Sequence, residues 1–374
     1  MNRKSLRVRR VRRSLPDQNQ RVSATRLFPS ETGFSILELL VATALLLIVS
    51  AIVTTALTQM TSAQKTVWNR TEMHSGVRGA TELLQQEVGQ AGRISLSATV
   101  SLNAAVTVPT SCDPADPTWN QVTKAVVSRD ANGNVVTLVN GINPLSGIFA
   151  TGGGSSAHEV LTTLDGDRQE TVKIASVDAA GSTITACFTK VHDSGTVLAP
   201  MGGFATGVIP PTGIANGSSA TVLKMYGDIN GDGNMVYVEY TCDATITHNL
   251  YRNVMAFNAA SKPPLTNSHI LLSNIVPNPV EPGTTVEKPC FTYQTSTITV
   301  GATPFTFVLD VAITLTVQTQ QVDPVTKAYQ TETKALLNVS PRNVFNAWAL
   351  AGMSYTDRIQ STPVSVTALL PPLP

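Results

Sequence analysis

One twelve-residue stretch of the sequence carries the side chains that a calcium-binding loop uses. It reads DINGDGNMVYVE and occupies residues 228–239. Oxygen donors alternate along it as in an EF-hand loop, with Gly233 for the sharp turn and a carboxylate at the twelfth position; the candidate ligands are Asp228, Asn230, Asp232, Asn234 and Glu239. Hard oxygen donors of this kind suit Ca²⁺, the one cofactor that the sequence suggests.

The residues around this loop leave two interpretations open. After Gly233 the sequence alternates as a β-strand, and no helical pattern flanks the loop. Either the loop binds Ca²⁺ between strands, or it is a turn rich in Asp and Asn whose side chains accept hydrogen bonds from their own backbone.

No arrangement of residues predicts catalysis. The five histidines are scattered, without an H-E-x-x-H motif or a pair four residues apart. VHDSG at 191–195 holds His, Asp and Ser in a row, but neighbours in sequence rarely face one site, and a polar strand end explains them better. Nucleophile-elbow and phosphate-binding motifs are absent from the sequence. We therefore do not expect an enzyme.

A membrane-length apolar segment lies behind a basic N-terminal block. Residues 1–33 contain nine Lys or Arg against two acidic residues, a net charge of +7, whereas the remaining residues carry −6. Residues 34–57 hold a single charged residue, Glu38, and would form a helix about 36 Å long, enough to span the hydrocarbon core. By the positive-inside rule, the basic block stays in the cytoplasm and the rest of the chain is exported.

The four cysteines all follow this segment, on the side expected to be exported. They are Cys112, Cys187, Cys242 and Cys290, and no two form a C-x-x-C pair, so a zinc site is not expected. An even number in an oxidising compartment predicts two disulfides. Proximity along the chain favours Cys112–Cys187 and Cys242–Cys290, although four cysteines allow three pairings.

The start of the apolar segment has an unusual order of residues. Gly33 precedes the apolar run rather than following it, and Phe34, Ser35, Ile36, Leu37 and Glu38 come next. This order resembles the processing site of type IV pilins and of the pseudopilins of type II secretion, in which a Gly is followed by an aromatic residue or Met and, five residues into the mature chain, by a Glu. Two positions depart from the usual pattern: Thr32 stands where Lys is common, and the leader is longer than most.

The resemblance implies how the chain is processed and what it contacts. A prepilin peptidase would cleave between Gly33 and Phe34, remove leader 1–33 and leave an N-methylated Phe34. Glu38 would act in assembly. The implied partners are this peptidase, other major and minor pilins, the inner-membrane assembly platform and, before assembly, membrane lipid. The family's role for Glu38 has a physical basis, because a carboxylate in hydrocarbon needs a partner and the new amine of Phe34 lies one helical turn away.

The helix should continue beyond the membrane. Apolar residues recur with a mean step of 3.6 on one helix face: Met73, Val77, Ala80, Leu84, Val88 and Ala91. Polar residues between them predict a solvated opposite face: Arg78, Glu82, Gln85, Gln86 and Glu87. Gly92 is a suitable end. We therefore expect a transmembrane half at 34–57 and an amphipathic periplasmic half at 58–93.

Residues 94–374 read as a β-rich exported domain with a Pro-rich tail. Short β-prone runs are separated by Gly, Pro, Asn and Asp, at 134–141, 169–177, 182–191, 220–227 and 235–242. Residues 305–317 alternate most regularly, and 328–339 should return as their antiparallel partner. The expected fold class is α+β, with a long N-terminal helix packed on a C-terminal antiparallel sheet.

Together these features favour a minor pilin of the PilW type. This second resemblance is looser, because it rests on the length of the chain and on the general character of its segments and not on fixed spacing. Such a subunit is stored in the inner membrane with its β domain in the periplasm, and then enters or primes a type IV pilus at the cell surface. One alternative is a minor pseudopilin of a type II secretion system. Another is a membrane-tethered exported binding protein or enzyme that does not polymerise. DNA binding is disfavoured because the residues after the leader are acidic overall and their basic side chains are dispersed.

Overall fold

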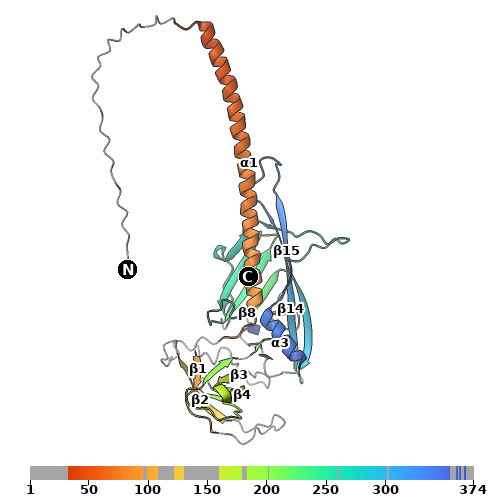
Figure 1. The fold of residues 1–374 in the computed structure, drawn as a ribbon. Coiled ribbons are helices and arrows are strands. Elements are labelled where there is room, and N and C mark those ends of the chain that lie inside the picture. The colour runs from red at the N-terminus through yellow and green to blue at the C-terminus, as the bar shows by residue number, and fades with distance from the viewer. Residues whose placement is uncertain are drawn as a thin grey trace, which may run out of the picture. The chain divides into compact units, whose positions relative to one another are not determined.

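The computed structural model describes one long helix, two antiparallel sheets and a small barrel (Figure 1). The residues described are 33–95, 99–107, 122–129, 160–178, 183–200, 202–257, 259, 261–300, 303–353, 359–360, 362–363 and 366–367. Contacts divide the chain into two compact units, Met1–Met60 and Thr61–Pro374. The leader up to Thr32 and the strand expected at 134–141 lie outside the described residues.

Helix α1 is a single element of 55 residues, Ile36–Gln90. The unit that ends at Met60 holds its apolar part, in which every described side chain is exposed. By length and composition, α1 could cross a membrane once. The helix begins two residues after the expected start at 34 and ends three residues before the expected end at 93, just ahead of Gly92, which takes a positive φ of 78°.

The second half of α1 lies in the unit that starts at Thr61 and has the apolar face that its periodicity predicts. Val77, Ala80, Leu84, Val88 and Ala91 are buried, and Met73 is partly buried beside them. They share one hydrophobic core with residues of both antiparallel sheets. Burial of about 25 cal/mol per Å² of apolar surface is what holds such a helix in place.

The first of these sheets is a meander that pairs consecutive strands in the order β11–β10–β9–β8. Its strands are β8 (Val222–Gly227), β9 (Val236–Asp243), β10 (Asn249–Ala256) and β11 (Ile270–Ser273). The second sheet is built on the long β14, which pairs with its three neighbours antiparallel. Its strands are β12 (Ile275–Val276), β13 (Phe291–Val300), β14 (Thr303–Gln318) and β15 (Thr331–Val339).

A six-stranded closed barrel lies between α1 and the first sheet in the sequence, with strand order β1–β2–β5–β4–β3–β6. Its strands are β1 (Thr99–Leu102), β2 (Val122–Arg129), β3 (Val160–Leu164), β4 (Thr171–Asp178), β5 (Thr183–Ala186) and β6 (Val197–Pro200). The remaining elements are short: β7 (Gly203–Phe204), β16 (Ile359–Gln360), α3 (Arg342–Gly352), and the 3₁₀ turns η2 (Gly166–Arg168) and η3 (Asn267–His269).

These elements confirm the predicted α+β class. The β-prone runs at 169–177, 182–191, 220–227 and 235–242 match β4, β5, β8 and β9; β5 and β8 lie within their runs, and β4 and β9 each extend one residue further. The run at 305–317 is β14, and β15 returns antiparallel to it as expected. The barrel and α3 were not predicted.

Strand β14 does not keep one face to the core along its whole length. Its register with β13 shifts where Gln294 pairs with Asp310 and Thr295 pairs with Val308, which leaves Leu309 as an extra residue. Phe307 therefore packs in a core with α3, whereas Val308, Val311 and Ile313 pack in the core with α1. A bulge of this kind re-aims the side chains beyond it.

Just after α1, the backbone at Gly92 packs directly against other backbone segments. Gly92 donates its N–H to Tyr226 O at 2.9 Å, and its own carbonyl accepts the N–H of Phe204 at 3.1 Å. Gly207 lies so close that a Cβ added there would be 2.2 Å from the Cα of Gly92. The two backbones can lie this close to each other only because both residues are glycines and neither carries a side chain.

Candidate functional site

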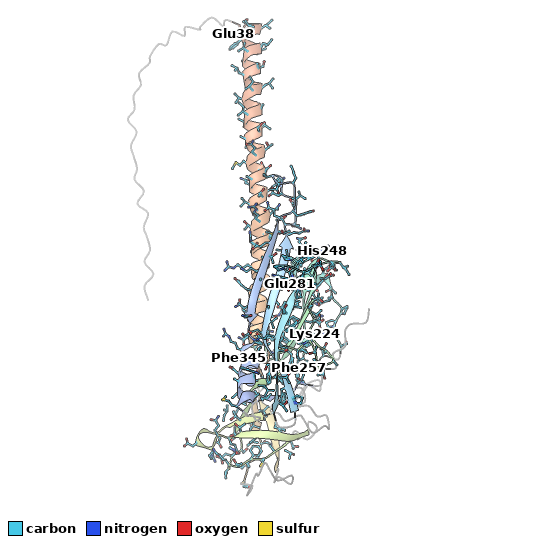
Figure 2. The ribbon with its side chains drawn as sticks, turned by 90° about the vertical axis from the view of Figure 1, so that its right-hand side faces the viewer. Glu38, Lys224, His248, Phe257, Glu281 and Phe345 are labelled. Carbon is cyan, nitrogen blue, oxygen red and sulfur yellow. A yellow bond between two sulfur atoms is a disulfide. The ribbon has the colours of Figure 1, made fainter. Side chains whose placement is uncertain are left out.

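The predicted processing site lies at the N-terminal end of α1, where the first turn is capped (Figure 2). Glu38 Oε2 accepts the N–H of Ser35 at 3.0 Å, and Ser35 Oγ accepts the N–H of Leu37 at 3.3 Å. This arrangement is a variant of the capping box in which Ser35 Oγ accepts the N–H of Leu37 and not that of Glu38, and it satisfies two backbone donors at the helix start. The Ser-x-x-Glu spacing was visible in the sequence, but it was not interpreted as a cap.

The capping box holds the Glu38 carboxylate next to the chain just before the helix. The hydrogen bond to Ser35 N places the carboxylate one residue from Phe34, whose side chain is 87% exposed. A negative group at this position also interacts favourably with the positive end of the helix dipole. A new amine on Phe34 would therefore start close to a carboxylate.

A long apolar surface continues along the same helix. Large apolar side chains on all sides of it are exposed in residues 34–57: Phe34, Ile36, Leu37, Leu39, Leu40, Val41, Leu45, Leu46, Leu47, Ile48, Val49, Ile52, Val53 and Leu57. Soluble proteins rarely expose a continuous apolar surface of this extent, and the helix is long and apolar enough to span a membrane once.

The other half of α1 is fixed by a buried carboxylate, where the sequence predicted a solvated face. Glu87 is buried and accepts hydrogen bonds from Arg252 Nε at 3.1 Å, from the second guanidinium nitrogen and from the Tyr240 hydroxyl. The prediction for Glu87 was wrong because helical spacing shows which face a residue occupies, but not that a distant arginine can pair with it. Arg78, Glu82, Gln85 and Gln86 are exposed as predicted.

Burial and the Glu87 carboxylate affect Tyr240 in the same direction. Both raise the pKa of the Tyr240 hydroxyl, so it stays neutral and donates. On Arg252, burial opposes the charge, but the hydrogen bond to Glu87 and the charge of its carboxylate, together with Tyr240, outweigh burial and raise the pKa. The result is a buried ion pair with an added hydroxyl donor, linking α1 to β9 and β10.

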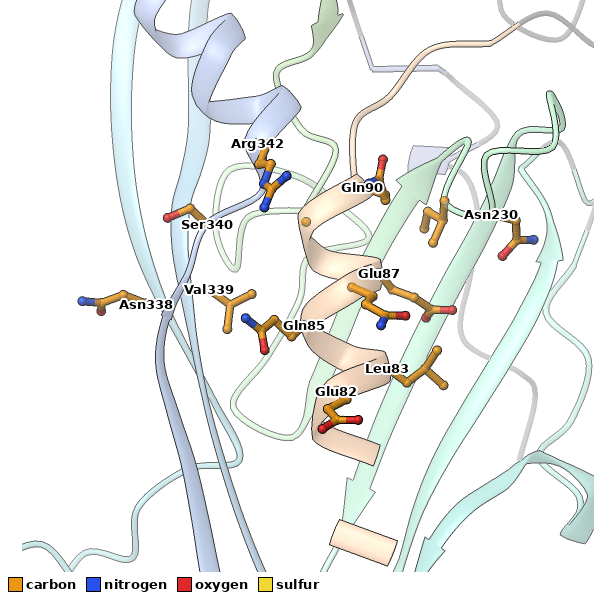
Figure 3. Close-up of a pocket in the computed structure, with 13 residues that line it drawn as sticks. Glu82, Leu83, Gln85, Glu87, Gln90, Asn230, Asn338, Val339, Ser340 and Arg342 are labelled. Atoms are coloured by element: carbon orange, nitrogen blue, oxygen red, sulfur yellow. The ribbon is translucent and has the colours of Figure 1, made fainter. Parts of the chain in front are cut away.

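A groove of about 910 Å³ runs beside this half of α1 (Figure 3). Helix residues such as Gln85, Glu87 and Gln90 line one side, and Val339, Ser340 and the start of α3 line another. The lining is mostly amide, carboxylate and hydroxyl groups, with Leu83, Ile229 and Val339 as its apolar members. Nothing in the sequence indicated this groove.

The five candidate calcium ligands are not brought together. Asp228 is buried, and its Oδ1 accepts the N–H of Asp232 at 3.1 Å, while its Oδ2 lies 3.7 Å from Arg93 Nε. Asp232 Oδ1 accepts the N–H of Asn234 at 2.9 Å. These are the contacts of the alternative interpretation, a turn whose Asp and Asn side chains bind their own backbone.

Glu239 and Asn230 lie apart from these turn contacts. Glu239 sits within β9 and accepts hydrogen bonds from Lys262 and Tyr237, and Asn230 is exposed. Among the described residues, no three His, Cys, Asp or Glu are grouped so as to hold a metal. The EF-hand interpretation is corrected here, because strand geometry directs Glu239 away from the turn.

The His-Asp-Ser row does not form a catalytic site among the described residues. His192 is buried, with Nδ1 2.9 Å from Asp165 Oδ2 and Nε2 2.8 Å from Glu170 Oε1, whereas Ser194 donates to Asn103 O. The hydrogen bond from His192 lowers the pKa of Asp165. Both ring nitrogens are occupied, so this histidine ties the barrel loops together.

One of the two predicted disulfides is present in the described residues. Cys242 at the end of β9 is bonded to Cys290, just before β13, and so joins the two sheets. Cys187 is also disulfide-bonded. Its predicted partner Cys112 lies outside the described residues.

Comparison with models of known protein families, with curated proteins and with solved structures finds no match to this chain.

Proposed function

We propose that the chain is a minor pilin-like structural subunit, processed by a prepilin peptidase and assembled into a type IV pilus or into the complex that primes it. The observation that carries the proposal is the composition of α1. The Gly33–Phe34 site directly precedes α1, and Glu38 lies in its first turn. The helix continues as an apolar segment with its side chains exposed and ends as a half that is packed in a core.

In this proposal each half of α1 has its own task. The apolar half resides in the lipid bilayer before assembly and packs with the same helices of other subunits afterwards. The packed half connects it to the β-rich unit, which lies on the periplasmic side and then at the cell surface. The work is structural, and the partners are the peptidase, other pilins and the inner-membrane assembly platform.

Glu38 is the residue on which assembly depends. Before assembly its carboxylate caps the helix through Ser35. In a bundle of helices, the carboxylate of an incoming subunit pairs with the Phe34 amine of a neighbour, and the cost of leaving either charge unpaired in apolar surroundings sets the axial register.

Two measurements in a host with its own pilus machinery test the proposal. The first is mass spectrometry of the mature N-terminus, which should begin at N-methylated Phe34. The second compares Glu38→Gln with Glu38→Ala in sheared filaments. Gln keeps an oxygen to accept the Ser35 N–H but has no charge. It therefore distinguishes the effect of losing the helix cap from the effect of losing the ion pair with the Phe34 amine.

We expect both variants to be cleaved, and filament incorporation of both to fall more than about a hundredfold, since unpairing a buried charge costs about 3–5 kcal/mol. Glu82→Ala, an exposed glutamate on the same helix, should assemble normally. Normal incorporation of Glu38→Gln would reduce the role of Glu38 to capping. A chain that retains residues 1–33, or that localises normally without ever polymerising, would favour the membrane-tethered alternative.

A further inference from the structure

A buried cluster on the first sheet brings together a lysine, an asparagine and a glutamate. Lys262 follows β10, Asn216 precedes β8, and Glu239 lies within β9. The Lys262 side chain is only 2% exposed, and Asn216 is buried. The neighbouring Tyr237 belongs to a different hydrophobic core from the one that contains α1. The cluster therefore lies outside the core that contains α1, and its chemistry does not depend on the proposed function.

Hydrogen bonds connect these groups into a closed ring. Lys262 Nζ donates to Glu239 Oε2 at 2.7 Å and to Asn216 Oδ1 at 3.1 Å. Asn216 Nδ2 donates to the Tyr237 hydroxyl at 3.1 Å, and that hydroxyl donates to Glu239 Oε2 at 2.9 Å. The amine, the carboxamide and a path for protons between them are thus held in one place.

We propose that Lys262 and Asn216 react with each other to form an intramolecular isopeptide bond, with Glu239 as the proton acceptor. Glu239 first takes a proton from the Lys262 ammonium. The neutral Nζ then attacks Asn216 Cγ, and the carbonyl electrons move to Oδ1. The Nζ–Cγ bond forms first and gives a tetrahedral intermediate. The carbonyl then re-forms from the oxyanion, the Cγ–Nδ2 bond breaks, and Nδ2 leaves as ammonia.

The ring supplies the proton transfers that this reaction needs. Nδ2 requires one proton to leave as ammonia, and Glu239 delivers it through the Tyr237 hydroxyl. Nζ must lose a second proton after attack, which Glu239 accepts and releases with the departing ammonia as ammonium. Glu239 ends as the carboxylate with which it began, and no group is oxidised or reduced. Burial raises the pKa of Tyr237, which keeps its hydroxyl neutral for this relay.

A second lysine lies where negative charge develops during the attack. Lys224 in β8 (Figure 2) donates from Nζ to Asn216 Oδ1 at 3.1 Å, the oxygen that becomes an oxyanion. A cation held at that oxygen stabilises the tetrahedral intermediate. Lys224 and Glu239 are also directly paired residues of β8 and β9, so the sheet register places this charge.

Charge balance provides a driving force for the reaction. Before it, two ammonium groups share one carboxylate in a buried site, an arrangement that desolvation and mutual repulsion disfavour. Burial first, and then the charge of Lys262, lower the pKa of Lys224. Afterwards Lys262 is a neutral amide and Lys224 faces Glu239 with equal and opposite charge. The bond would also join the segment before β8 covalently to the segment after β10. A pulling force on the chain would then bypass β8, β9 and β10.

Mass spectrometry of the full chain, purified in detergent with its disulfides reduced, tests the proposal. We expect a mass lower than that of the sequence by about 17 Da, the ammonia released in the acyl transfer. Because Asn216 precedes Gly217, a succinimide at Asn216 would lose the same mass. Tandem mass spectrometry of a protease digest must therefore find a branched peptide that joins Lys262 to Asn216.

Three variants separate the groups involved. Lys262→Met should remove the branched peptide and leave any succinimide unaffected. Glu239→Gln should also remove it, because Gln cannot accept the proton. Glu281→Gln, an exposed carboxylate elsewhere, should keep the bond. Circular dichroism checks that each variant is folded, and the presence or absence of the Lys262–Asn216 branched peptide in the wild type decides the question even if a variant is not.

An unchanged wild-type mass, a mass loss that Lys262→Met retains, or a branched peptide through Lys224 would each overturn the proposal. A branched peptide that survives in folded Glu239→Gln would overturn the assignment of Glu239.

Discussion

The buried carboxylate of Glu87 connects the second half of α1 to the first sheet through its ion pair with Arg252. We predict that Glu87→Ala lowers the free energy of unfolding by about 2–3 kcal/mol, because it leaves the Arg252 guanidinium without its partner. The effect is smaller than for a fully buried pair, since the Arg252 side chain is 26% exposed. Urea unfolding of the full chain in detergent, followed by near-ultraviolet circular dichroism, measures it.

Glu82→Ala is the matched control. Glu82 lies on the same helix and, among the described residues, pairs with Arg78, four residues earlier, at an exposed position. Such a pair contributes about 0.2–0.5 kcal/mol. Equal effects of the two substitutions would show that the Glu87 network does not hold the helix.

Asp243 gives the first sheet a defined response to acid. Burial alone would raise its pKa, but hydrogen bonds from the Ile246 backbone, from the hydroxyl and backbone of Thr247 and from the Thr245 backbone outweigh burial and lower it to about 2. A lowered carboxyl pKa contributes stability that is present above the unfolded value of about 4 and is lost as pH falls through the folded value.

We therefore predict that Asp243→Asn is less stable than the wild type at neutral pH, and that the difference narrows between about pH 4 and pH 2, where the wild type becomes protonated. Thermal unfolding midpoints of both proteins at intervals from pH 2 to pH 7 measure this. A difference that stays constant over the range would contradict the assignment.

At the level of the structural elements, the backbone contact between Gly92 and Gly207, at the end of α1, leaves no room for an added side chain. We predict that Gly207→Ala destabilises the fold by at least about 3 kcal/mol, because its Cβ would overlap the Gly92 backbone, which cannot move aside as a side chain can. Gly79→Ala is the control: it lies in the exposed helix with nothing near its Cβ, and should gain up to about 1 kcal/mol. Denaturant midpoints compare the two, and similar destabilisation by both would refute the steric explanation.

How far the sequence predicts these elements depends on whether a local pattern specifies them. The buried face of α1 repeats every 3.6 residues, so Val77, Ala80 and Leu84 could be assigned directly. In β14 the alternation of apolar residues is just as regular, yet the bulge at Leu309 moves Phe307 and Val311 into different cores. Alternation cannot reveal a bulge, because an extra residue leaves no mark in the pattern.

The site residues divide in the same way. The cap at Glu38 depends on residues within one turn, and the Ser-x-x-Glu spacing could have shown it. The spacing of the candidate calcium ligands was that of an EF-hand loop, but the interpretation failed because Glu239 lies in β9 and pairs with Lys262 and not with the other candidate ligands. Contacts such as Glu87–Arg252 and Asn216–Lys262 join residues far apart in the chain, and single-sequence patterns do not encode them.

For the whole molecule, the exposed apolar part of α1 predicts how the full chain fractionates in a cell. We expect it to remain with membranes during alkaline carbonate extraction. Leu46→Arg should move part of it to the soluble or aggregated fraction, because a charge at the centre of a membrane helix costs about 2.5–3.5 kcal/mol. Gln59→Arg adds the same charge outside residues 34–57 and should have little effect. Release of the wild-type chain by carbonate would contradict the membrane assignment.

The contact between Gly92 and Gly207 also has a consequence for evolution. Surface loops can change in length and composition, and the barrel can be rebuilt around different side chains. At Gly207 every substitution adds a Cβ that overlaps the backbone of Gly92, and at Gly92 the positive φ and the tight surroundings of a Cβ disfavour any other residue. Related sequences, however far they have diverged, should therefore keep both glycines together, and a lineage that lost one of them would have had to redirect its chain at the end of the helix.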